Sequence, residues 1–560
     1  MEYVPPLADI AFALRQAAPS AGLDREMAES LLDAAGAFAA GEIAPLDRPG
    51  AHQGACYENG TVTAAAGFAQ TYRRWCDDGW NGVAAPEEWG GAALPFPLAA
   101  ALTEIWNGAS LSFGLCPMLS QSALRVLLRH APEALKPAIL PPLVAGRWTA
   151  TMNLTEPQAG SDLAALTTRA VPAEEGTFRL FGQKIFITWG EHDLAENILH
   201  LVLARLPGAA AGTRGISLFL AAKFGLDGAG GGAGGIGPRN DLRCLGIERK
   251  LGIHASPTCT MGFGLDRGAI AHLIGAPGEG LRAMFAMMNE ARLATGLQGV
   301  AVAARASAQA AAFAAERRQG TDAGGARVAI ETHPDVRRML LEMRARTLAA
   351  RAIAFRAAAC LDAAEDPQAA ARLALLTPIA KAHGAETGVE VASLGIQVHG
   401  GVGYVEETGA AQLWRDARIV PIYEGTNGIQ AIDLVLRKLR RDGGAAAGAE
   451  LTAIAAMIAG VTDGALRERL GQGLAALREA SEHLLDPATG ERAALAVATP
   501  YLRLFALVLG AALLARDGGA VDAPADAARL ARFHAAHLLP AASGLSASVR
   551  AGAEAIAEGG

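Results

Sequence analysis

One stretch of this chain embeds a carboxylate in apolar sequence: Ile419-Val420-Pro421-Ile422-Tyr423-Glu424-Gly425-Thr426-Asn427-Gly428-Ile429-Gln430. The Gly, Thr and Asn residues that follow Glu424 favour a turn with exposed backbone N–H groups. Apolar surroundings raise the pKa of a carboxyl group, as a general base working near neutral pH requires. Residue type alone favours a different interpretation, a solvated Glu at the start of a helix, because charged side chains are mostly exposed. The choice between a base and an exposed charge depends on the rest of the chain.

Composition places the chain among globular proteins that are rich in helix and built from several domains. Hydrophobic residues make up 51% of the 560 residues and charged residues 19%, and the abundant Ala, Leu, Glu and Arg favour helices. The formal net charge of −7 and the pI near 6.0 give no electrostatic footprint for nucleic acid. We therefore expect no nucleic acid partner, and no basic cluster resembles a membrane anchor.

The cysteines and the N-terminus indicate a reducing compartment. Six cysteines are spread along the chain without a C-x-x-C pair or a spacing suited to zinc, so no metal site is expected. Residues 1–6 lack the basic and apolar regions of a signal peptide, which predicts a cytoplasmic protein. The longest apolar segment, Ala493 to Ala515, is broken by Pro500 and Arg503. It is expected to be a buried helix and not a membrane span, which needs roughly 20 apolar residues.

Sections with different sequence patterns follow one another along the chain. Residues 1–148 and 276–442 carry apolar residues at helical spacing, and the helices of the second section are long enough to form an antiparallel bundle. Residues 149–275 hold short strand-like runs between Gly, Pro and Asp, which predicts a middle β domain. Residues 443–560, after a break at Asp442-Gly443-Gly444-Ala445, are expected to form a separate module of four helices. The predicted fold class is mainly α with a central β domain.

Gly and Pro separate the strand-like runs and the helical patterns. The expected strands span 150–154, 178–181, 184–188, 199–204, 216–221 and 258–263. The expected helices span 8–17, 23–40, 62–77, 98–128, 281–318, 334–363 and 368–394, with a shorter one after Thr426. Gly225 to Gly237 contains eight glycines in thirteen residues and is expected to be a flexible surface loop.

Four motifs follow one another in a characteristic order along the chain. They are Leu154-Thr155-Glu156-Pro157-Gln158-Ala159-Gly160-Ser161-Asp162, Lys184-Ile185-Phe186-Ile187-Thr188-Trp189-Gly190, Gln397-Val398-His399-Gly400-Gly401-Val402-Gly403-Tyr404 and Ile422-Tyr423-Glu424-Gly425-Thr426. In order and spacing they resemble the acyl-CoA dehydrogenase family over about residues 80 to 440. The segment from Tyr3 to Phe12 and the tail after residue 445 resemble a long bacterial subgroup. That subgroup includes 3-methylmercaptopropionyl-CoA dehydrogenases and broad-range fatty acyl-CoA dehydrogenases.

The resemblance implies a helical N-terminal domain, a β-barrel middle domain, a four-helix-bundle domain and the extra C-terminal helical module. It implies a flavoprotein oxidoreductase of fatty acid β-oxidation, which uses noncovalent FAD to convert an acyl-CoA thioester to a trans-2-enoyl-CoA. Electron-transferring flavoprotein is the implied acceptor. Because the extra module could cover the surface through which shorter relatives pair dimers into tetramers, we expect a homodimer.

The first two motifs offer groups that suit a flavin. Thr155 and Ser161 provide hydroxyls in a turn with exposed backbone donors, which can bind a flavin edge or a phosphate. By resemblance both contact FAD, and the alternative is that they only cap a loop. Phe186 and Thr188 are two residues apart on an expected strand and so face the same side; the resemblance places them against the flavin ring. Most family members have Trp where Phe186 stands, and Phe can stack but lacks the indole N–H.

The third motif looks superficially like a dinucleotide fingerprint. Gln397, Gly400 and Gly401 follow a helical pattern and not a strand, so a Rossmann site is not expected. The resemblance instead implies a backbone nest over the FAD pyrophosphate, usually contributed across a subunit interface.

Three further positions concern the binding of FAD in the family. One matches a family contact, one lacks it and one is expected to replace it. Arg317 matches the arginine that binds an FAD phosphate, with Arg318 as the rival and an ordinary helix-end arginine as the other interpretation. Gly428 stands where shorter relatives often have Gln. Thr426 and the backbone of its turn are therefore expected to hold the cofactor there.

The helix that starts near Gly280 carries the expected substrate contacts. Asn289 and Arg292 are three residues apart and share a face, which by resemblance meets the pantetheine and thioester end of the substrate. Structural capping or a buried ion pair is the alternative. Some relatives place their catalytic base where this chain has Ala291, which cannot take a proton. That leaves Glu424 as the predicted base.

Two other functions stay open at this point. An acyl-CoA oxidase would share these motifs but would let oxygen reach the reduced flavin. A non-catalytic acyl-CoA or flavin-binding assembly protein could have kept the fold, although the retained Glu424 argues against it.

Overall fold

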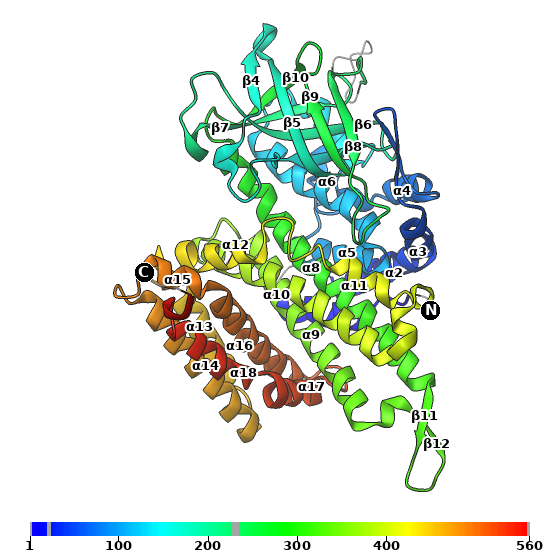
Figure 1. Cartoon of the computed structure of the whole chain (residues 1–560), viewed down its shortest axis with the longest axis vertical. Coiled ribbons are helices and arrows are strands. Elements are labelled where there is room, and N and C mark those ends of the chain that lie inside the picture. The colour runs from blue at the N-terminus through cyan, green and yellow to red at the C-terminus, as the bar shows by residue number, and fades with distance from the viewer. Residues whose placement is uncertain (1–2, 19–23, 227–234, 557–560) are drawn as a thin grey trace. The chain divides into compact units, whose positions relative to one another are not determined.

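The computed structural model describes residues 3–18, 24–226 and 235–556, so most of the predicted loop from Gly225 to Gly237 lies outside the described residues. The chain divides into two compact units, each assembled from segments that are distant in sequence (Figure 1). The first unit comprises Met1–Ala37, Pro95–Gly108 and Arg292–Gly560, and the second comprises Phe38–Leu94 and Ala109–Ala291. The domain boundaries expected near residues 148, 275 and 442 stay predictions.

The second unit is organised around an eight-stranded sheet. Its strands are β3 (Trp148–Asn153), β4 (Arg169–Pro172), β5 (Phe178–Thr188), β6 (Asn197–Arg205), β7 (Ile216–Ala222), β8 (Leu242–Ile247), β9 (Thr258–Phe263) and β10 (Ala269–Ile274). The strand order is β10-β7-β6-β4-β5-β9-β8, β3 pairs with β6, and β10 also pairs with β5. Because this last pairing joins β10, β7, β6, β4 and β5 into a ring, the predicted middle β barrel is confirmed.

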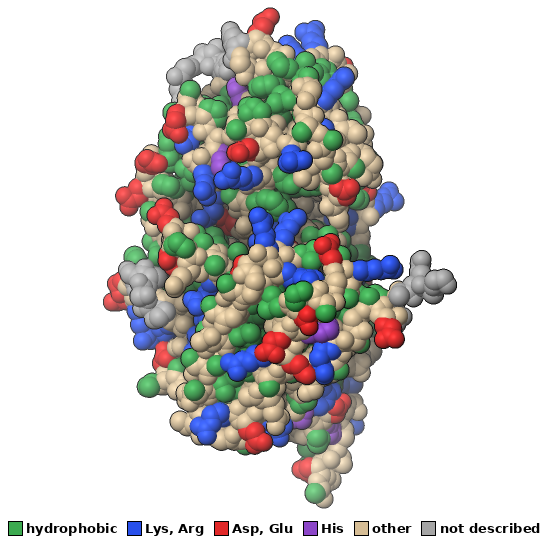
Figure 2. All heavy atoms as spheres, turned by 90° about the vertical axis from the view of Figure 1, so that its left-hand side faces the viewer, with side chains coloured by type: hydrophobic (Ala, Val, Ile, Leu, Met, Phe, Trp, Pro, Cys, Tyr) green, Lys and Arg blue, Asp and Glu red, His purple; other side chains and the backbone are tan. Residues whose placement is uncertain are grey.

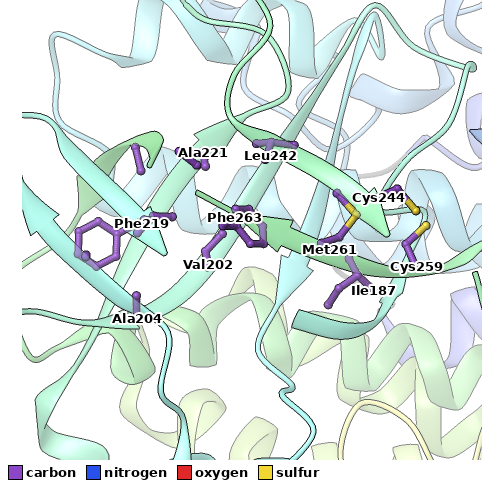
Figure 3. Close-up of a cluster of buried hydrophobic side chains, with 14 of the residues drawn as sticks. Ile187, Val202, Ala204, Phe219, Ala221, Leu242, Cys244, Cys259, Met261 and Phe263 are labelled. Carbon is purple, nitrogen blue, oxygen red and sulfur yellow. The ribbon is translucent and has the colours of Figure 1, made fainter. Parts of the chain in front are cut away.

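Apolar side chains from several strands of this sheet form one buried cluster. Val202, Phe219, Leu242, Met261 and Phe263 come from β6, β7, β8 and β9 and pack in one cluster (Figure 3). None of them is more than 1% exposed. Burial of such side chains stabilises by roughly 1.5–3 kcal/mol each. Ile187 of the second motif belongs to the same cluster, so the core of the sheet anchors this motif.

Strand β5 is continuous where the sequence suggests two strands separated near Gly182. A Cβ on Gly182 would lie 2.9 Å from the Cα of Thr168, so this glycine permits a close approach of backbones and does not mark a turn. The sequence also misses β4, β8 and β10. Strand β4 is short and ends in Pro172, and β8 contains Arg243 and Gly246, so pairing with neighbours and not composition makes them strands.

Helices and a small hairpin complete the second unit. They are α3 (Ala44–Gln53), α4 (Phe68–Asp77), α6 (Leu111–His130), α7 (Lys136–Val144), β1 (Cys56–Glu58) and β2 (Thr61–Thr63). The helix expected over 62–77 begins only at Phe68, because Thr61–Thr63 pairs with Cys56–Glu58. Asn59 and Gly60 between these strands both have positive φ, 48° and 85°, as the two-residue turn of a hairpin requires.

The first unit is helical except for a small hairpin of β11 (Arg318–Thr321) and β12 (Arg327–Ala329). Its helices before residue 440 are α1 (Leu7–Ala17), α2 (Arg25–Phe38), α5 (Phe96–Ala109), α8 (Gly280–Glu316, which begins in the second unit), α9 (Pro334–Asp362), α10 (Pro367–His399), α11 (Ala410–Ala417) and α12 (Asn427–Ile432). A Cβ on Gly299 of α8 would lie 2.0 Å from the carbonyl oxygen of Gly384 on α10. The two helices therefore cross in backbone contact, which only glycine allows. The long helices predicted over 281–318, 334–363 and 368–394 are confirmed within about five residues. The single helix predicted over 98–128 is wrong, because the chain is extended at Ser110, which ends α5 and caps α6.

The C-terminal part contains more helices than expected. They are α13 (Ala445–Ala459), α14 (Gly464–Leu485), α15 (Glu491–Ala496), α16 (Ala498–Gly518), α17 (Ala527–Phe533) and α18 (Ala541–Arg550). Helix α13 starts directly after Gly444, so the break before it is a tight turn and not a linker. Glu450 of α13 is 1% exposed and accepts hydrogen bonds from Arg356 at 2.8 and 3.2 Å and from Arg372 at 3.1 Å. These charged contacts attach the module to α9 and α10.

Two helices, α6 and α16, are long and apolar enough to cross a membrane by length and composition. Their most apolar windows are 83% and 78% buried inside the protein, as in core helices. The buried helix predicted from Ala493 to Ala515 corresponds mainly to α16, and Pro500 falls in its first turn, where its missing N–H costs little.

On the face drawn in Figure 2, basic and acidic side chains are interspersed.

Candidate active site

Glu424 lies in the turn between α11 and α12 with a strained backbone. Its φ is +55°, and it is followed by Gly425 at +83°. Such a conformation costs a residue other than glycine about 1–3 kcal/mol and persists only where the surroundings hold it. Thr426 then caps α12, because its hydroxyl accepts a hydrogen bond from the Ile429 N–H at 3.2 Å.

Two buried side chains donate hydrogen bonds to the carbonyl oxygens of the strained turn. Arg292 of α8 is buried, and its Nε donates to the carbonyl oxygen of Glu424 at 3.4 Å. Gln430 of α12 is also buried, and its Nε2 donates to the carbonyl oxygens of Glu424 at 3.4 Å and Gly425 at 3.2 Å. These hydrogen bonds fix the backbone of the turn. The position from which the Glu424 side chain extends is therefore fixed as well.

The charge state of Glu424 is balanced between burial and two cations. Burial raises its pKa to about 7, although Arg292 and Lys381 oppose that rise. Lys381 of α10 is fully buried, and its Nζ donates to the Val420 carbonyl at 3.0 Å and to Asn427 Oδ1 at 3.1 Å. Burial lowers the pKa of Lys381 to about 7. Glu424 is still partly accessible, so a ligand can reach a carboxyl group that is poised near neutral pH.

Tyr423 anchors the same turn from the other side. Its hydroxyl donates to Gln298 Oε1, and Gln298 Nε2 donates to Asn107 Oδ1 at 3.1 Å. The sequence analysis did not single out Gln298, Lys381 or Gln430. Lys381 leaves a trace in the sequence, as a lone cation in an apolar helical run, but one sequence does not reveal its hydrogen-bond partners.

Glu156 organises the first motif in the second unit. Its carboxylate accepts hydrogen bonds from the backbone N–H and the hydroxyl of Thr167, at 2.7 and 2.8 Å, and from those of Thr168, at 3.0 and 2.6 Å. Lys184 Nζ donates to it at 2.8 Å, and neither charged side chain is more than 2% exposed. Burial alone would raise the pKa of Glu156, but Lys184 and these donors hold it at about 2.

The Glu156 network joins the first two motifs. The Ile185 N–H donates to the Thr155 carbonyl at 2.9 Å, and Lys184 Nζ donates to the Leu154 carbonyl at 3.0 Å. The side chain of Thr155 is half-buried and that of Ser161 is exposed, so both hydroxyls are accessible to a ligand.

Phe186 lies on an irregular part of β5. The pairing with β9 shifts by one residue between Lys184 and Ile187, which is a β-bulge. Within it Phe186 has a φ of +60° and is 58% exposed. Phe186 and Thr188 are both more accessible than Ile187 between them. Strain in an exposed aromatic residue points to a functional constraint.

The predicted phosphate residues of the first unit lie at the ends of two helices that contact each other. The rings of Phe313 and His399 stack with centroids 4.5 Å apart, which places the end of α8 beside the end of α10. Arg317 follows α8, and Gln397, Gly400 and Gly401 lie at the exposed end of α10. The helix before this glycine motif agrees with the rejection of a Rossmann site. Arg318, the rival to Arg317, donates to the Arg327 carbonyl at 3.3 Å within a hairpin.

Of the residues on α8, Arg292 contacts the catalytic turn and Asn289 is exposed. Ala291 is buried, and Glu290 is buried in an ion pair with Arg125. Glu290 is therefore held by a cation as a structural group.

The accessible groups fit FAD. An exposed aromatic ring on a bulged strand suits the face of an isoalloxazine. In the second unit the hydroxyls of Thr155 and Ser161 can donate to a ring edge or a phosphate. In the first unit, taken by itself, Arg317 and the backbone of the glycine turn can each bind a phosphate. Each predicted contact to FAD stays a prediction.

Comparison with known proteins defines the class. Family models match residues 25–147 (acyl-CoA dehydrogenase, N-terminal domain), 151–264 (middle domain), 278–439 (C-terminal domain) and 449–558 (acetyl-CoA dehydrogenase C-terminal like). The chain also shares 44% identity with a 3-methylmercaptopropionyl-CoA dehydrogenase of Ruegeria pomeroyi, over 90% of this chain and 89% of that protein. The chain belongs to the acyl-CoA dehydrogenase family, with the extra C-terminal domain of its long members.

Solved structures show the same fold. Caenorhabditis elegans ACDH-11, in complex with C11-CoA, aligns with a TM-score of 0.79 and 23% identity over 96% of this chain and 93% of that one. An acyl-CoA dehydrogenase from Bacillus anthracis, complexed with FAD, aligns with a TM-score of 0.70 and 21% identity over 88% and 84%. The protein is a flavoprotein oxidoreductase that dehydrogenates acyl-CoA thioesters with FAD as its cofactor.

Proposed function

We propose that Glu424 is the base that removes the proton from the carbon α to the thioester carbonyl. The observation that carries this proposal is a half-buried carboxyl group whose pKa is raised to about 7, on a strained backbone held by Arg292 and Gln430. A base with that pKa is about half deprotonated at neutral pH, which suits proton transfer from carbon.

The turn also provides a donor for the substrate carbonyl. Within the described part of the chain, the N–H of Glu424 donates no hydrogen bond. We propose that it donates to the thioester oxygen, whose negative charge grows as the α-proton leaves. Loss of one such donor typically costs about 2.7–4 kcal/mol of activation free energy. Bound FAD supplies the acceptor for the hydride from the β-carbon, so that the product is a trans-2-enoyl-CoA.

Arg292 and Lys381 have different tasks in this proposal. Arg292 fixes the carbonyl of Glu424, and Lys381 binds the Val420 carbonyl before the turn and the side-chain Oδ1 of Asn427 after it. Both cations favour the carboxylate form of Glu424 before proton transfer. Neither is placed to accept a proton while it is charged, because a protonated amine or guanidinium has no acceptor.

The rate of flavin reduction is expected to depend on pH through Glu424. The base must be deprotonated, so its raised pKa predicts a rate that is low in acid and rises as the pH increases through about 7. Well below that value the rate falls about tenfold per pH unit. Anaerobic rapid mixing at limiting acyl-CoA measures it as a second-order rate constant, which reports the free enzyme, and a constant that does not change between pH 5 and 8 would count against this assignment.

Arg317 is expected to hold a phosphate of FAD. Arg317→Ala should purify with markedly less flavin and recover it at high FAD concentration, because one charge-assisted contact to phosphate is lost. Arg318→Ala is the matched control, since its guanidinium donates to the Arg327 carbonyl. The flavin-to-protein absorbance ratio measures the effect. Equal loss in both variants would mean that the hairpin itself, and not Arg317, retains the flavin.

The electron acceptor, the assembly and the compartment complete the proposal. We infer that electrons leave through electron-transferring flavoprotein, as the family resemblance implies. A homodimer is inferred from the extra C-terminal module, and a cytoplasmic location from six free cysteines.

One experiment tests the function as a whole. The purified holoenzyme is mixed with a panel of acyl-CoA thioesters, from straight-chain acyl groups to 3-methylmercaptopropionyl-CoA, without oxygen and then with it. We expect flavin bleaching, a product lighter by two hydrogen atoms, and turnover only with an added acceptor. Rapid hydrogen peroxide formation without an acceptor would instead identify an oxidase.

A further inference from the structure

The catalytic turn has a second support that reaches into the C-terminal module. Asn427, the first residue of α12, lies directly after the turn that carries Glu424. Its Oδ1 accepts a hydrogen bond from Lys381 at 3.1 Å, and its Nδ2 donates to the Ala382 carbonyl at 3.2 Å and to Glu386 Oε1 at 3.4 Å. Its backbone N–H donates to the Pro421 carbonyl at 3.0 Å, which closes the turn. The side chain of Asn427 thus fixes the turn against α10.

Glu386 is itself held by an arginine from a distant part of the sequence. Arg503 of α16 donates from Nε to Glu386 Oε2 at 3.0 Å and from Nη2 to Glu386 Oε1 at 3.2 Å. This two-point contact fixes both the position and the plane of the carboxylate. The side chain of Glu386 is 19% exposed and that of Arg503 is 53% exposed, so the pair lies at the edge of the unit.

We propose that Arg503 is a positioning residue for the dehydrogenation. It acts through Glu386 and Asn427 to fix the turn that carries Glu424. The inference rests on the proposed role of Glu424 as the base. It gives the C-terminal module a function in catalysis, because α16 packs against both α10 and α12 and supplies the arginine that holds Glu386.

The positive charge of Arg503 is needed to hold the Glu386 carboxylate in place. Without Arg503, the Glu386 carboxylate would keep Lys381 as a nearby cation but would lose the arginine on its solvent side, while the like charge of Glu390 remains close. Glu386 could then turn away from Asn427, and the amide of Asn427 would lose one of its acceptors. The turn would keep its fold through Lys381, Arg292 and Gln430 but would sample more orientations of the base.

The matched variants are Arg503→Gln and Arg516→Gln. Both arginines are on α16 and both form an ion pair, but Arg516 pairs with its neighbour Asp517 and lies more than three helical turns further along α16 than Arg503. We expect Arg503→Gln holoenzyme to lower kcat by about five- to tenfold with KM changed less than about twofold, since small misplacements of reacting groups slow chemistry strongly. Arg516→Gln should behave as the wild type.

Hydrogen exchange gives a readout that does not require turnover. Backbone amides between Ile419 and Asn427 should exchange up to about fivefold faster in Arg503→Gln, the effect of losing a half-exposed ion pair. Amides of α13 and α14 should not change. If Arg503→Gln lowers the melting temperature but leaves kcat and the exchange of the turn amides unchanged, Arg503 is only a surface contact. That result would overturn the proposal.

A double-mutant cycle separates this proposal from the assignment of the base. If Arg503 acts through Glu386, the variant carrying both Arg503→Gln and Glu386→Gln should lose no more rate than the worse single variant. Multiplied losses would overturn the coupling. In the same assay Glu424→Gln reports on the base alone. If that variant still reduces flavin rapidly, the proposed function fails, whatever Arg503 does.

Discussion

Glu424→Gln enzyme should bind FAD normally and reduce it at least about 10²- to 10⁴-fold more slowly than the wild type when mixed anaerobically with acyl-CoA, the usual contribution of a positioned base. Gln has the same length and the same backbone preference as Glu, so the strained turn at φ +55° stays as it is. The carbonyl contacts from Arg292 and Gln430 go to the backbone and also stay. Only the ability to take a proton is removed.

Two companion variants sharpen that result. Glu424→Asp keeps a carboxyl group, and Asp tolerates a left-handed backbone better than Glu. Its carboxyl group is withdrawn by one methylene, so we expect a rate between those of Glu and Gln. Glu407→Gln changes an exposed carboxylate of the same unit and should leave the rate constant unchanged. Rapid bleaching by Glu424→Gln with normal flavin content would remove Glu424 from the chemistry.

Glu156→Ala is expected to have the largest effect on stability. It leaves the fully buried Lys184 without its carboxylate, and Thr167 and Thr168 without the acceptor of their hydroxyl and N–H groups. Removal of one partner from a buried ion pair typically destabilises by about 3–5 kcal/mol. Because Thr155 and Ser161 flank Glu156 in sequence, the variant should also purify with little flavin.

Thermal unfolding and flavin content measure this effect together. The control is Glu196→Ala, which breaks a half-exposed ion pair with Arg147 at 3.2 Å in the same unit. Such a surface pair contributes about 0–1 kcal/mol, so the melting temperature should change little. If Glu156→Ala melts and binds flavin as the control does, the buried network does not hold the first motif.

The sequence predicts the architecture well because its determinants are local. Helical spacing identifies the long helices, and strand composition identifies most of the barrel. Strand β4 and the continuity of β5 escape prediction, because they depend on pairing: a backbone contact at Gly182 decides the latter. The hairpin at Asn59-Gly60 carries a recognisable two-residue turn signal, yet the helical pattern of the residues that follow obscures it.

In the candidate site, too, some residues can be predicted from the sequence and others cannot. Glu424 is identified from its place in the motif order, and its environment then explains why a carboxyl group there is poised near neutral pH. The residues that hold the turn, such as Lys381, Gln298 and Arg503, are 43 to 126 residues away from Glu424 in sequence. Their roles depend on helix packing in three dimensions, so no local pattern reveals them.

The central claim is that Glu424 moves the α-proton, and hydrogen exchange at that carbon tests it most directly. A 3-thiaacyl-CoA has sulfur in place of the β-carbon, so it cannot pass a hydride but keeps its acidic α-hydrogens. In D₂O the wild-type holoenzyme should exchange those hydrogens for deuterium, as mass spectrometry of the recovered thioester shows, and Glu424→Gln should not. Equal exchange by both enzymes would contradict the account.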